Sequence, residues 1–383
     1  MKNISIYIAS SFVFFFLFSI PTHSFADLNV KETVNVGILL DAESLNIASD
    51  KKYSIKNSEK ILNLSQGNIN IRILGDKIIA GKYNLKLPVK ITSDSYILVN
   101  KVIYRGNIVI RLSKNRKLNI INVLNIEDYL KGVLPKEASA SWDIEALKAQ
   151  AVISRSYIIK NLNRHIAENF NVCSSVHCQV YGGASAENEK CNKAIADTQG
   201  QVLMFDGEIA QTVFHASCGG YTEDPKYVWD WKNETPDYLK GRKDKYCSES
   251  PHNEWKCALS EKTIRKKLLS SGYQIGSIKK ITLSGNTGGH AKEFVIITHK
   301  DGKLKLKTYK FRLAVDSGLI KSAMIKNIKR KGTDFIFSGK GWGHRVGLCQ
   351  CGAKVMAEKG FSYKKILQYY YPKTEIKIIE YEK

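Results

Sequence analysis

Glu137 is the residue of this chain whose sequence surroundings best suit acid and base chemistry. It lies in the segment LPKEASASW, where Pro135 precedes it, Trp142 follows it and Lys136 is the only neighbouring cation. An apolar setting raises the pKa of a carboxyl group, so that the group can donate a proton near neutral pH. The alternative is an exposed loop carboxylate, or a charge that favours the start of a helix.

Two cysteines and two histidines further along the chain could hold a metal ion. His165 is followed by Cys173 and Cys178, and His177 is adjacent to Cys178. Thiolate and imidazole are ligands that zinc takes in tetrahedral sites. Because neighbouring residues of an extended strand point to opposite faces, His177 and Cys178 share a metal only if the loop kinks. The pattern therefore favours His165 with the two thiolates, and the alternative is a Cys173–Cys178 disulfide.

A long amphipathic helix is predicted to follow the acidic residue and to position it. Within residues 134–163, apolar or small residues recur at a helical spacing that makes one stripe to bury, and Ser141 can cap the first turn. Lys148 and Arg155 fall along one edge of that stripe, and Gln150 falls along the other. An arginine so close to a buried seam needs an anionic or carbonyl partner.

A shorter helix is predicted just before the long one. Asn125 can cap its first turn, and Gly132 is placed where the helix should stop. Pro135 then favours an extended conformation at Leu134. We therefore expect Glu137 in a loop between two helices.

The first part of the chain is β-rich. Over residues 34–124, short apolar or alternating segments are separated by glycines, as in strands joined by tight turns. Together with the helices, this pattern predicts an α+β fold. We expect a signal peptide over residues 1–26, a β-rich domain over residues 27–122 and a mixed domain, built around the long helix, over residues 123–383. Residues 221–257 form a loop-rich insertion of a length that is usually functional.

The chain resembles the SpoIID family, which comprises the stage II sporulation protein D lytic transglycosylases and their SpoIID/LytB-domain relatives. The resemblance covers roughly residues 123–371 and rests on several segments that stand in the family's order. These segments are EDYLKGVLPKE (Glu127 to Glu137), WDIEALKAQAV (Trp142 to Val152), QVYGG (Gln179 to Gly183), FHASCGGYTED (Phe214 to Asp224) and GKGWGHRVGLCQCGA (Gly339 to Ala353). One segment alone would be weak evidence, but the ordered set is specific.

The resemblance implies cleavage of peptidoglycan glycan between N-acetylmuramic acid and N-acetylglucosamine, on strands denuded of stem peptides. Glu137 matches the family's catalytic glutamate. A single carboxyl group would protonate the glycosidic oxygen and then take a proton from the muramoyl C6 hydroxyl, which leaves a 1,6-anhydro end. This differs from the two-carboxylate arrangement of most glycoside hydrolases.

Other polar residues of the matching segments are expected to bind the glycan. They are Gln150, Arg155, His215, Ser217, Tyr221 and His344. For Gln150 and Arg155, support of the segment around Glu137 is an equal alternative, and for His344 the alternative is a histidine satisfied within the core.

The resemblance also bears on the cysteines. Some family members hold a zinc ion by cysteine and histidine at the place of His165, Cys173 and Cys178, while others lack it, so a structural zinc is expected here. The chain departs from the family's commoner sequence motif at two positions. Arg345 stands where Gly is usual, and Cys349 stands where Ser is usual. Disulfides are the alternative use of the remaining thiols. Cys349 and Cys351 could then pair with cysteines elsewhere, namely Cys218, Cys247 or Cys257.

Charge and the N-terminal segment indicate an exported protein. Lys2 precedes an apolar run from Ile4 to Ile20, and Ser24-Phe25-Ala26 suits signal cleavage, so that Asp27 would begin the mature chain. The alternative is an uncleaved membrane anchor. The formal net charge is +23, and no nucleic-acid motif occurs, so the expected counterpart is an anionic cell-wall polymer or a membrane surface, in the periplasm or the wall. The alternative is a lysine-rich composition that only keeps the protein soluble.

The sequence therefore predicts an exported lytic transglycosylase that acts on peptidoglycan glycan strands with Glu137 as acid and base. The alternative is a non-catalytic relative that binds wall glycan and stimulates a cell-wall amidase. A third reading, a structural wall protein held by charge alone, does not account for the acidic segment.

Overall fold

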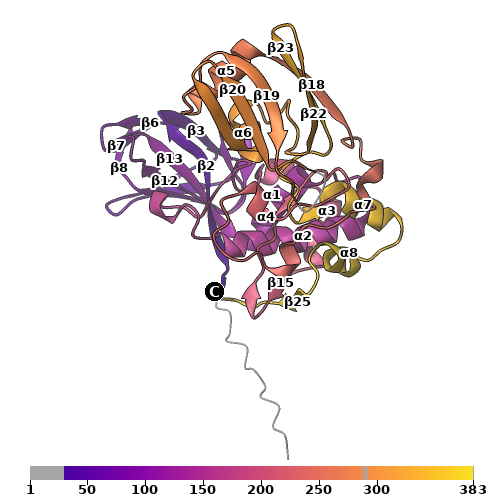
Figure 1. Ribbon diagram of the computed structural model, residues 1–383. Coiled ribbons are helices and arrows are strands. Elements are labelled where there is room, and N and C mark those ends of the chain that lie inside the picture. Colours follow the sequence, from indigo (N-terminus) through magenta and orange to yellow (C-terminus); the bar gives the residue numbers. More distant parts are fainter. Residues whose placement is uncertain (1–29, 288–290, 383) are drawn as a thin grey trace, which may run out of the picture.

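The computed structural model describes residues 30–287 and 291–382, so the expected signal peptide lies outside the described residues. Strands dominate the first part of the chain, and helices and short sheets follow (Figure 1). This arrangement confirms the α+β fold class. The described ends lie side by side, because β1 (Val30–Lys31) pairs in parallel with β26 (Tyr381–Glu382).

Two sheets form the N-terminal part. The six-stranded sheet has the order β11 (Val102–Tyr104), β10 (Ile97–Val99), β3 (Ser44–Ser49), β6 (Gly67–Leu74), β7 (Lys77–Ala80) and β8 (Tyr83–Lys86). The seven-stranded sheet has the order β14 (Val172–Cys173), β2 (Thr33–Ala42), β13 (Leu118–Asn125), β12 (Asn107–Leu112), β9 (Val89–Ser93), β4 (Tyr53–Lys56) and β5 (Ile61–Leu64). Alternate residues of both sheets, such as Ile47 and Ile110, are buried in one hydrophobic core.

The N-terminal sheets continue directly into the helical part. The predicted boundary between residues 122 and 123 falls inside β13, which pairs along its length with β2 and β12. Asn125 ends β13 and, as predicted, caps the next helix, because its side chain accepts a hydrogen bond from the backbone N–H of Asp128. The sheet therefore sets the direction in which that helix leaves.

The helical part surrounds one long central helix. Its helices are α1 (Ile126–Glu137), α2 (Ile144–Lys160), α3 (Glu189–Ala196), α7 (Gln350–Glu358) and α8 (Tyr363–Tyr370). A three-stranded sheet has the order β16 (Glu208–Ile209), β15 (Gln201–Phe205) and β25 (Glu375–Ile378). A parallel pair consists of β17 (Phe214–His215) and β24 (Leu348–Cys349). α2 packs against α1, α3, α7, α8 and β15.

The long helix is present, but the structure does not confirm its predicted amphipathic character. Most residues of α2 from Ala146 to Ile158 are buried, including the polar Gln150, Ser154 and Arg155. A helix enclosed on all sides needs no polar face. The helix also begins later than predicted, with Asp143 rather than Ser141 as the cap, because the Asp143 side chain accepts from the N–H of Glu145.

The shorter helix differs from its prediction at the end that matters for chemistry. α1 does not stop at Gly132 but continues through Pro135, so Leu134 is helical rather than extended and Glu137 is the last helical residue rather than a loop residue. Leu134 is fully buried. Burial of a leucine side chain stabilises the folded state by about 1.5–3 kcal/mol. This gain outweighs the preference of a residue before proline for an extended conformation.

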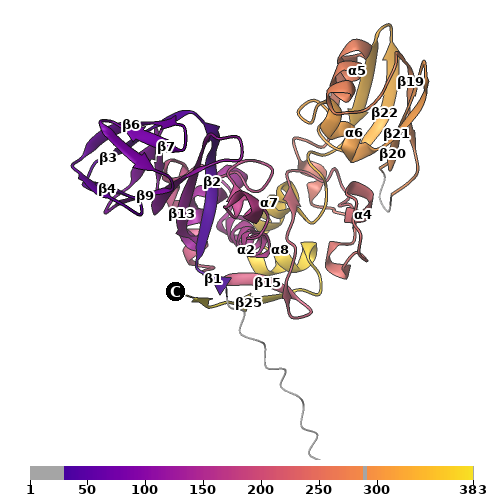
Figure 2. The same ribbon diagram turned by 90° about the vertical axis from the view of Figure 1, so that its left-hand side faces the viewer.

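A third part with its own hydrophobic core is inserted between residues 255 and 339. It contains β18 (Trp255–Ser260), β19 (Ile278–Ser284), β20 (Phe294–His299), β21 (Gly302–Lys307), β22 (Ile325–Lys331), β23 (Asp334–Gly339), α5 (Glu261–Ser270) and α6 (Thr308–Val315). Figure 2 shows this part, in orange, well separated from the N-terminal sheets. The loop-rich stretch before it carries α4 (Pro225–Val228) and the short 3₁₀ turns η3 (Asp237–Leu239) and η4 (Cys247–Glu249).

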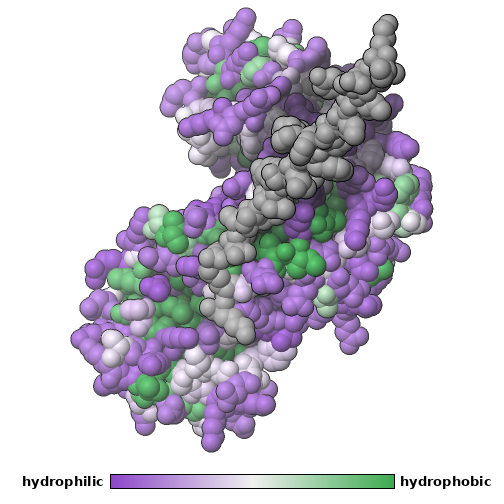
Figure 3. All heavy atoms as spheres, turned by 90° about the horizontal axis from the view of Figure 1, so that it is seen from below, coloured by the Kyte–Doolittle hydropathy of each residue, from purple (hydrophilic) through white to green (hydrophobic). Residues whose placement is uncertain are grey.

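One face of the protein is largely hydrophilic, with apolar patches between the polar side chains. Hydrophilic side chains cover most of the face seen from below in Figure 3. Among the described residues, no helix is long and apolar enough to cross a membrane.

Candidate active site around Glu137

The side chain of Glu137 extends from the C-terminal end of α1 toward the segment that follows the cysteine loop. Its Oε1 accepts a hydrogen bond from the backbone N–H of Val180 at 2.9 Å. Burial raises the pKa of the carboxyl group, and the Val180 N–H offsets part of that rise because it stabilises the anion. Among the described residues, Glu137 forms no ion pair. The carboxyl group of Glu137 therefore keeps its proton to a higher pH than an exposed glutamate does.

Close packing between α1 and the QVYGG segment places Val180 beside the acid. A Cβ added at Gly132 would lie 2.5 Å from the ring of Tyr181, so only glycine allows this contact. The N–H of Gly182 donates to the carbonyl of Gly132 at 3.0 Å. Gly132 thus serves the approach of a second segment rather than the end of the helix, which corrects its predicted role.

Two buried glutamines connect Glu137 to other helices. The amide Nε2 of Gln350 donates to the backbone carbonyl of Glu137 at 2.9 Å and to Oε1 of Gln150 at 3.3 Å. Gln150 in turn donates to the hydroxyl of Ser154. Gln150 is 2% exposed, so the geometry favours support of the Glu137 segment over glycan binding. Gln350 was not among the predicted site residues, although it lies within a segment that carried the family resemblance.

Arg155 is not available to bind a substrate. Its guanidinium is fully buried, and Nε and Nη2 donate to the two carboxylate oxygens of Glu127 at 2.7 and 2.8 Å. Nη1 donates to the carbonyl of Gln201. The predicted anionic partner is thus present. Of the two roles expected for Arg155, the geometry favours structural support, here of α1 and α2, over substrate binding.

His215 and His344 lie side by side where β17 and β24 pair. Their ring centroids are 5.5 Å apart, and Trp229 packs on His344. Burial lowers the pKa of His215 to about 4 and that of His344 to about 3, so both imidazoles are neutral near pH 7. Nδ1 of His344 accepts from the N–H of Val346, which agrees with a histidine satisfied within the fold.

The two histidines differ in how fully they are satisfied. Nδ1 of His215 lies 3.1 Å from the carbonyl of Val346, whereas its buried Nε2 has no hydrogen-bond partner in the part of the chain that the structure describes. Of the pair, His215 therefore has the atom with spare capacity for a ligand.

Ser217 and Tyr221 occupy different environments. Ser217 is fully buried and its hydroxyl bonds Ser250 and Cys247, which removes it from direct contact with a glycan and corrects that prediction. Tyr221 is half-buried, and its hydroxyl donates to the carbonyl of Gly241.

The three expected metal ligands and the alternative ligand His177 converge at one point. The donor atoms of His165, Cys173, His177 and Cys178 all lie within 4.8 Å of one another. The loop kinks, so the donor atom of His177 also lies within this group, which agrees with the alternative in which His177 shares the metal. All eight cysteines of the chain are free thiols in the structure, so the Cys173–Cys178 disulfide is not formed.

The spacing of these donor atoms suits a tetrahedral zinc ion. In a tetrahedral site, zinc bonds of about 2.3 Å to sulfur and about 2.0 Å to nitrogen place two sulfur ligands about 3.8 Å apart and two nitrogen ligands about 3.3 Å apart. The two Sγ atoms are 3.4 Å apart, and Nε2 of His165 lies 3.3 Å from Nδ1 of His177. Nδ1 of His165 bonds the carboxylate of Glu168, the kind of outer contact that orients a ligating imidazole.

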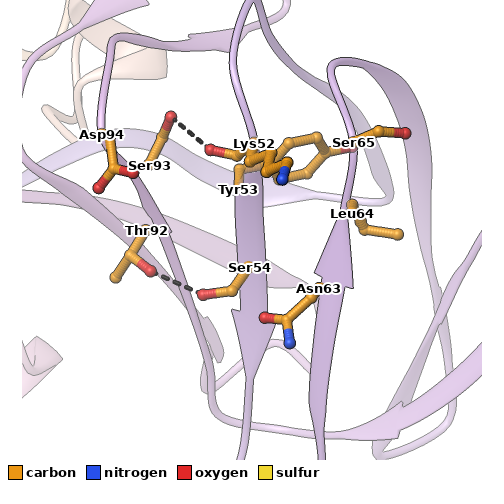
Figure 4. A pocket seen from close by; sticks show the side chains of 9 residues that line it. All are labelled: Lys52, Tyr53, Ser54, Asn63, Leu64, Ser65, Thr92, Ser93 and Asp94. Carbon is orange, nitrogen blue, oxygen red and sulfur yellow. Dashed lines mark hydrogen bonds between the residues drawn. The ribbon is translucent and has the colours of Figure 1, made fainter.

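A separate pocket of about 410 Å³ opens on the N-terminal sheets, between β4, β5 and β9 (Figure 4). Hydroxyl and amide side chains such as Ser54, Asn63 and Thr92 line it, with Asp94 as the one acidic residue. None of the residues that the sequence singled out lies in its lining, so this pocket is not part of the site around Glu137.

Comparison with known sequences identifies the family of the chain. A family model described as "SpoIID: Stage II sporulation protein" matches residues 114–205, which run from the last long strand of the N-terminal sheets to β15. The match includes Glu137 and the group of His165, Cys173, His177 and Cys178. The chain belongs to the SpoIID family.

Relatives extend the match beyond that region. The chain is 33% identical over 296 residues to an uncharacterized protein of Brachyspira hyodysenteriae, with 76% of each chain covered. It is 30% identical over 295 residues to the amidase enhancer of Bacillus subtilis, which covers 64% of this chain but only 40% of that protein. It is 29% identical over 266 residues to stage II sporulation protein D of Bacillus subtilis, covering 66% of this chain and 74% of that protein.

Proposed function

We propose that this protein is an exported peptidoglycan lytic transglycosylase that cleaves denuded strands between N-acetylmuramic acid and N-acetylglucosamine. The observation that carries the proposal is the state of Glu137, a largely buried carboxyl group with a raised pKa and one backbone hydrogen bond. No neighbouring charge of either sign contributes to that shift among the described residues. A hydrolase would need a second carboxyl group about 5–9.5 Å away, whereas a lytic transglycosylase does not.

In the proposed reaction, protonated Glu137 gives its proton to the glycosidic oxygen, and the bond from that oxygen to C1 of the muramoyl residue breaks. The resulting carboxylate then takes the proton of the C6 hydroxyl as the C6 oxygen bonds to C1. The products are a free N-acetylglucosamine hydroxyl and a 1,6-anhydro end, and Glu137 is protonated again. The Val180 N–H favours the intermediate carboxylate, while burial favours the resting acid.

A second candidate function is enhancement of a cell-wall amidase without cleavage of glycan. The name of the Bacillus subtilis relative favours it, although the match spans less than half of that protein. In that case the protein would bind glycan and present it to the amidase, or bind the amidase itself, without proton transfer.

Product analysis separates the two functions. The purified mature protein is incubated with glycan strands that carry stem peptides and with strands freed of them, and products are identified by mass spectrometry. Anhydro-muramoyl ends on the denuded strands support the proposal. An absence of cleavage, with a faster amidase reaction when the protein is added, would replace it by the enhancer function.

We further propose that His165, Cys173, His177 and Cys178 hold a structural zinc ion. Such an ion would link the end of α2 to β14 and to the residues just before Val180, and would so hold the hydrogen-bond donor of Glu137 in place. The ion would cross-link the fold, and no proton transfer involves it.

Replacing Cys178 with Ser is expected to remove about one zinc ion per chain and to lower the melting temperature, because zinc binding contributes free energy to the folded state. Elemental analysis and circular dichroism measure both effects. Cys257→Ser, a half-buried thiol of β18 outside this cluster, is the matched control and should keep its zinc. Metal-free protein with a Cys173–Cys178 disulfide would refute the zinc site.

A further inference from the structure

A second cluster of side chains that could hold a metal ion lies where the loop-rich stretch meets the glycine-rich segment. The buried sulfur cluster consists of three thiols and one carboxyl group, from Cys218, Asp244, Cys247 and Cys349. Their donor atoms all lie within 4.8 Å of one another. The three cysteines are fully buried, and Asp244 is 2% exposed.

We propose that the buried sulfur cluster is a second zinc site, structural in role, with three thiolates and one carboxylate as ligands. This inference does not depend on the proposed glycan cleavage. The site would be closed, because four protein ligands fill the tetrahedral coordination that structural zinc adopts.

The distances within the cluster suit zinc. Sγ of Cys247 and Sγ of Cys349 are 3.4 Å apart, and Sγ of Cys218 lies 3.2 Å from Oδ2 of Asp244. A tetrahedral zinc ion would place two sulfur ligands about 3.8 Å apart, and a sulfur and an oxygen ligand about 3.5 Å apart. The cluster would therefore bind the ion after its donor atoms move apart by about 0.3–0.4 Å. Soft thiolates in a tetrahedral set select zinc over magnesium or calcium.

The carboxyl group of Asp244 is a second, independent argument for a metal ion in the buried sulfur cluster. Among the described residues, no lysine, arginine or histidine forms an ion pair with it. Its hydrogen bonds come instead from the hydroxyl of Tyr370, the N–H of Tyr246 and the thiol of Cys218. A buried carboxyl group normally has a cation or a metal as its partner, and a divalent ion would supply one.

The surroundings also suit thiolates bound to a metal. The backbone N–H groups of Cys218 and Gly352 point at Sγ of Cys349, at 3.3 and 3.4 Å. Cys349 caps α7, where the helix dipole favours negative charge. The guanidinium of Arg345, also fully buried, donates to the backbone carbonyl of Cys218 at 3.0 Å, which brings a positive charge close to the cluster. Such outer contacts orient and stabilise metal ligands.

The consequence for the fold is a cross-link among three distant segments. Cys218 follows β17, and Cys349 ends β24. Cys247 begins η4 in the loop-rich stretch, and Asp244 lies three residues before it. β17 and β24 also carry His215 and lead to Gln350, so the ion would hold the loop-rich stretch against the strands beside the active site. A loop of that length has little regular structure of its own and needs such an anchor.

The test counts zinc in the full mature chain, purified with zinc present. We expect about two zinc ions per chain, one for each tetrahedral ligand set. Cys178→Ser and Cys247→Ser should each lose a different zinc ion, and a chain that carries both Cys178→Ser and Cys247→Ser should lose both ions. Cys191→Ser and Cys257→Ser, which lie outside both clusters, should retain two. Because Cys247→Ser could fail to fold, Asp244→Asn serves as a second variant that keeps the size of the side chain.

X-ray absorption at the zinc edge of the Cys173→Ser, Cys178→Ser double variant isolates the second site. Three sulfur ligands and one oxygen ligand are expected there. The proposal is overturned if that double variant holds no zinc, if folded Cys247→Ser and Asp244→Asn both keep two ions, or if peptide mapping of the wild type finds a disulfide among Cys218, Cys247 and Cys349. One zinc that is lost in Cys247→Ser but kept in Cys178→Ser would support this site and refute the first.

Discussion

Glu137→Gln is expected to abolish glycan cleavage while the fold and the binding of glycan are kept. Glutamine has nearly the same size and can still accept the hydrogen bond from the Val180 N–H. It cannot donate a proton to the glycosidic oxygen or recover one from the C6 hydroxyl. Loss of general acid and base catalysis lowers rates by about 10²–10⁴-fold. The yield of anhydro-muramoyl product by mass spectrometry measures the loss.

Stability gives an independent readout for the same variant. Burial raises the pKa of Glu137, so the folded state holds this proton more tightly than the unfolded state. The contribution of Glu137 to the free energy of unfolding is therefore full below the unfolded pKa and is lost as the pH rises through the folded pKa. Glutamine does not ionise, so Glu137→Gln should be at least as stable as the parent near pH 7, by urea unfolding.

A matched control is available at the next helix. Asp143→Asn keeps the cap of α2, because asparagine caps a helix as well as aspartate does, and it should retain near-normal turnover. Glu127 is unsuitable as a control because it holds Arg155. If Glu137→Gln cleaves glycan as fast as the parent, the catalytic assignment fails, whatever the stability of the variant.

Removing the carboxylate of Glu127 is expected to destabilise the protein by about 3–5 kcal/mol, because it leaves the buried guanidinium of Arg155 without a counter-charge. The same carboxylate also accepts from the hydroxyl of Tyr381 and the N–H of Gly200, so the C-terminal strand and the turn before β15 lose a partner as well. Urea unfolding of Glu127→Ala at pH 7 measures the change.

Two further variants identify the cause of that destabilisation. In Glu127→Leu with Arg155→Met, both charges are replaced by apolar side chains of similar size, and much of the stability should return. Glu358→Ala, which removes an exposed pair with Lys354, should change the free energy of unfolding by less than about 0.5 kcal/mol. A Glu127→Ala variant as stable as this control would contradict a buried ion pair.

Local patterns determined several features of this protein before any tertiary structure was considered. The cap at Asn125, the long helix over residues 144–160 and the β-rich first part follow from side-chain capping and hydrophobic spacing, which act over a few residues. The need of Arg155 for a partner follows from the cost of burying a charge. The choice of Glu137 as the acid and the SpoIID resemblance followed from short segments in a specific order.

The tertiary structure decided what those residues do, because the deciding contacts join segments far apart in the chain. α1 continues through Pro135 since Leu134 is buried, and Gly132 admits Tyr181 rather than ending the helix. His177 lies with His165, Cys173 and Cys178 because the loop kinks, and the alternation of side chains along a strand does not predict such a kink. Glu127 holds Arg155 across 28 positions, and Cys218, Cys247 and Cys349 meet through packing of separate segments, whose partners depend on the whole fold.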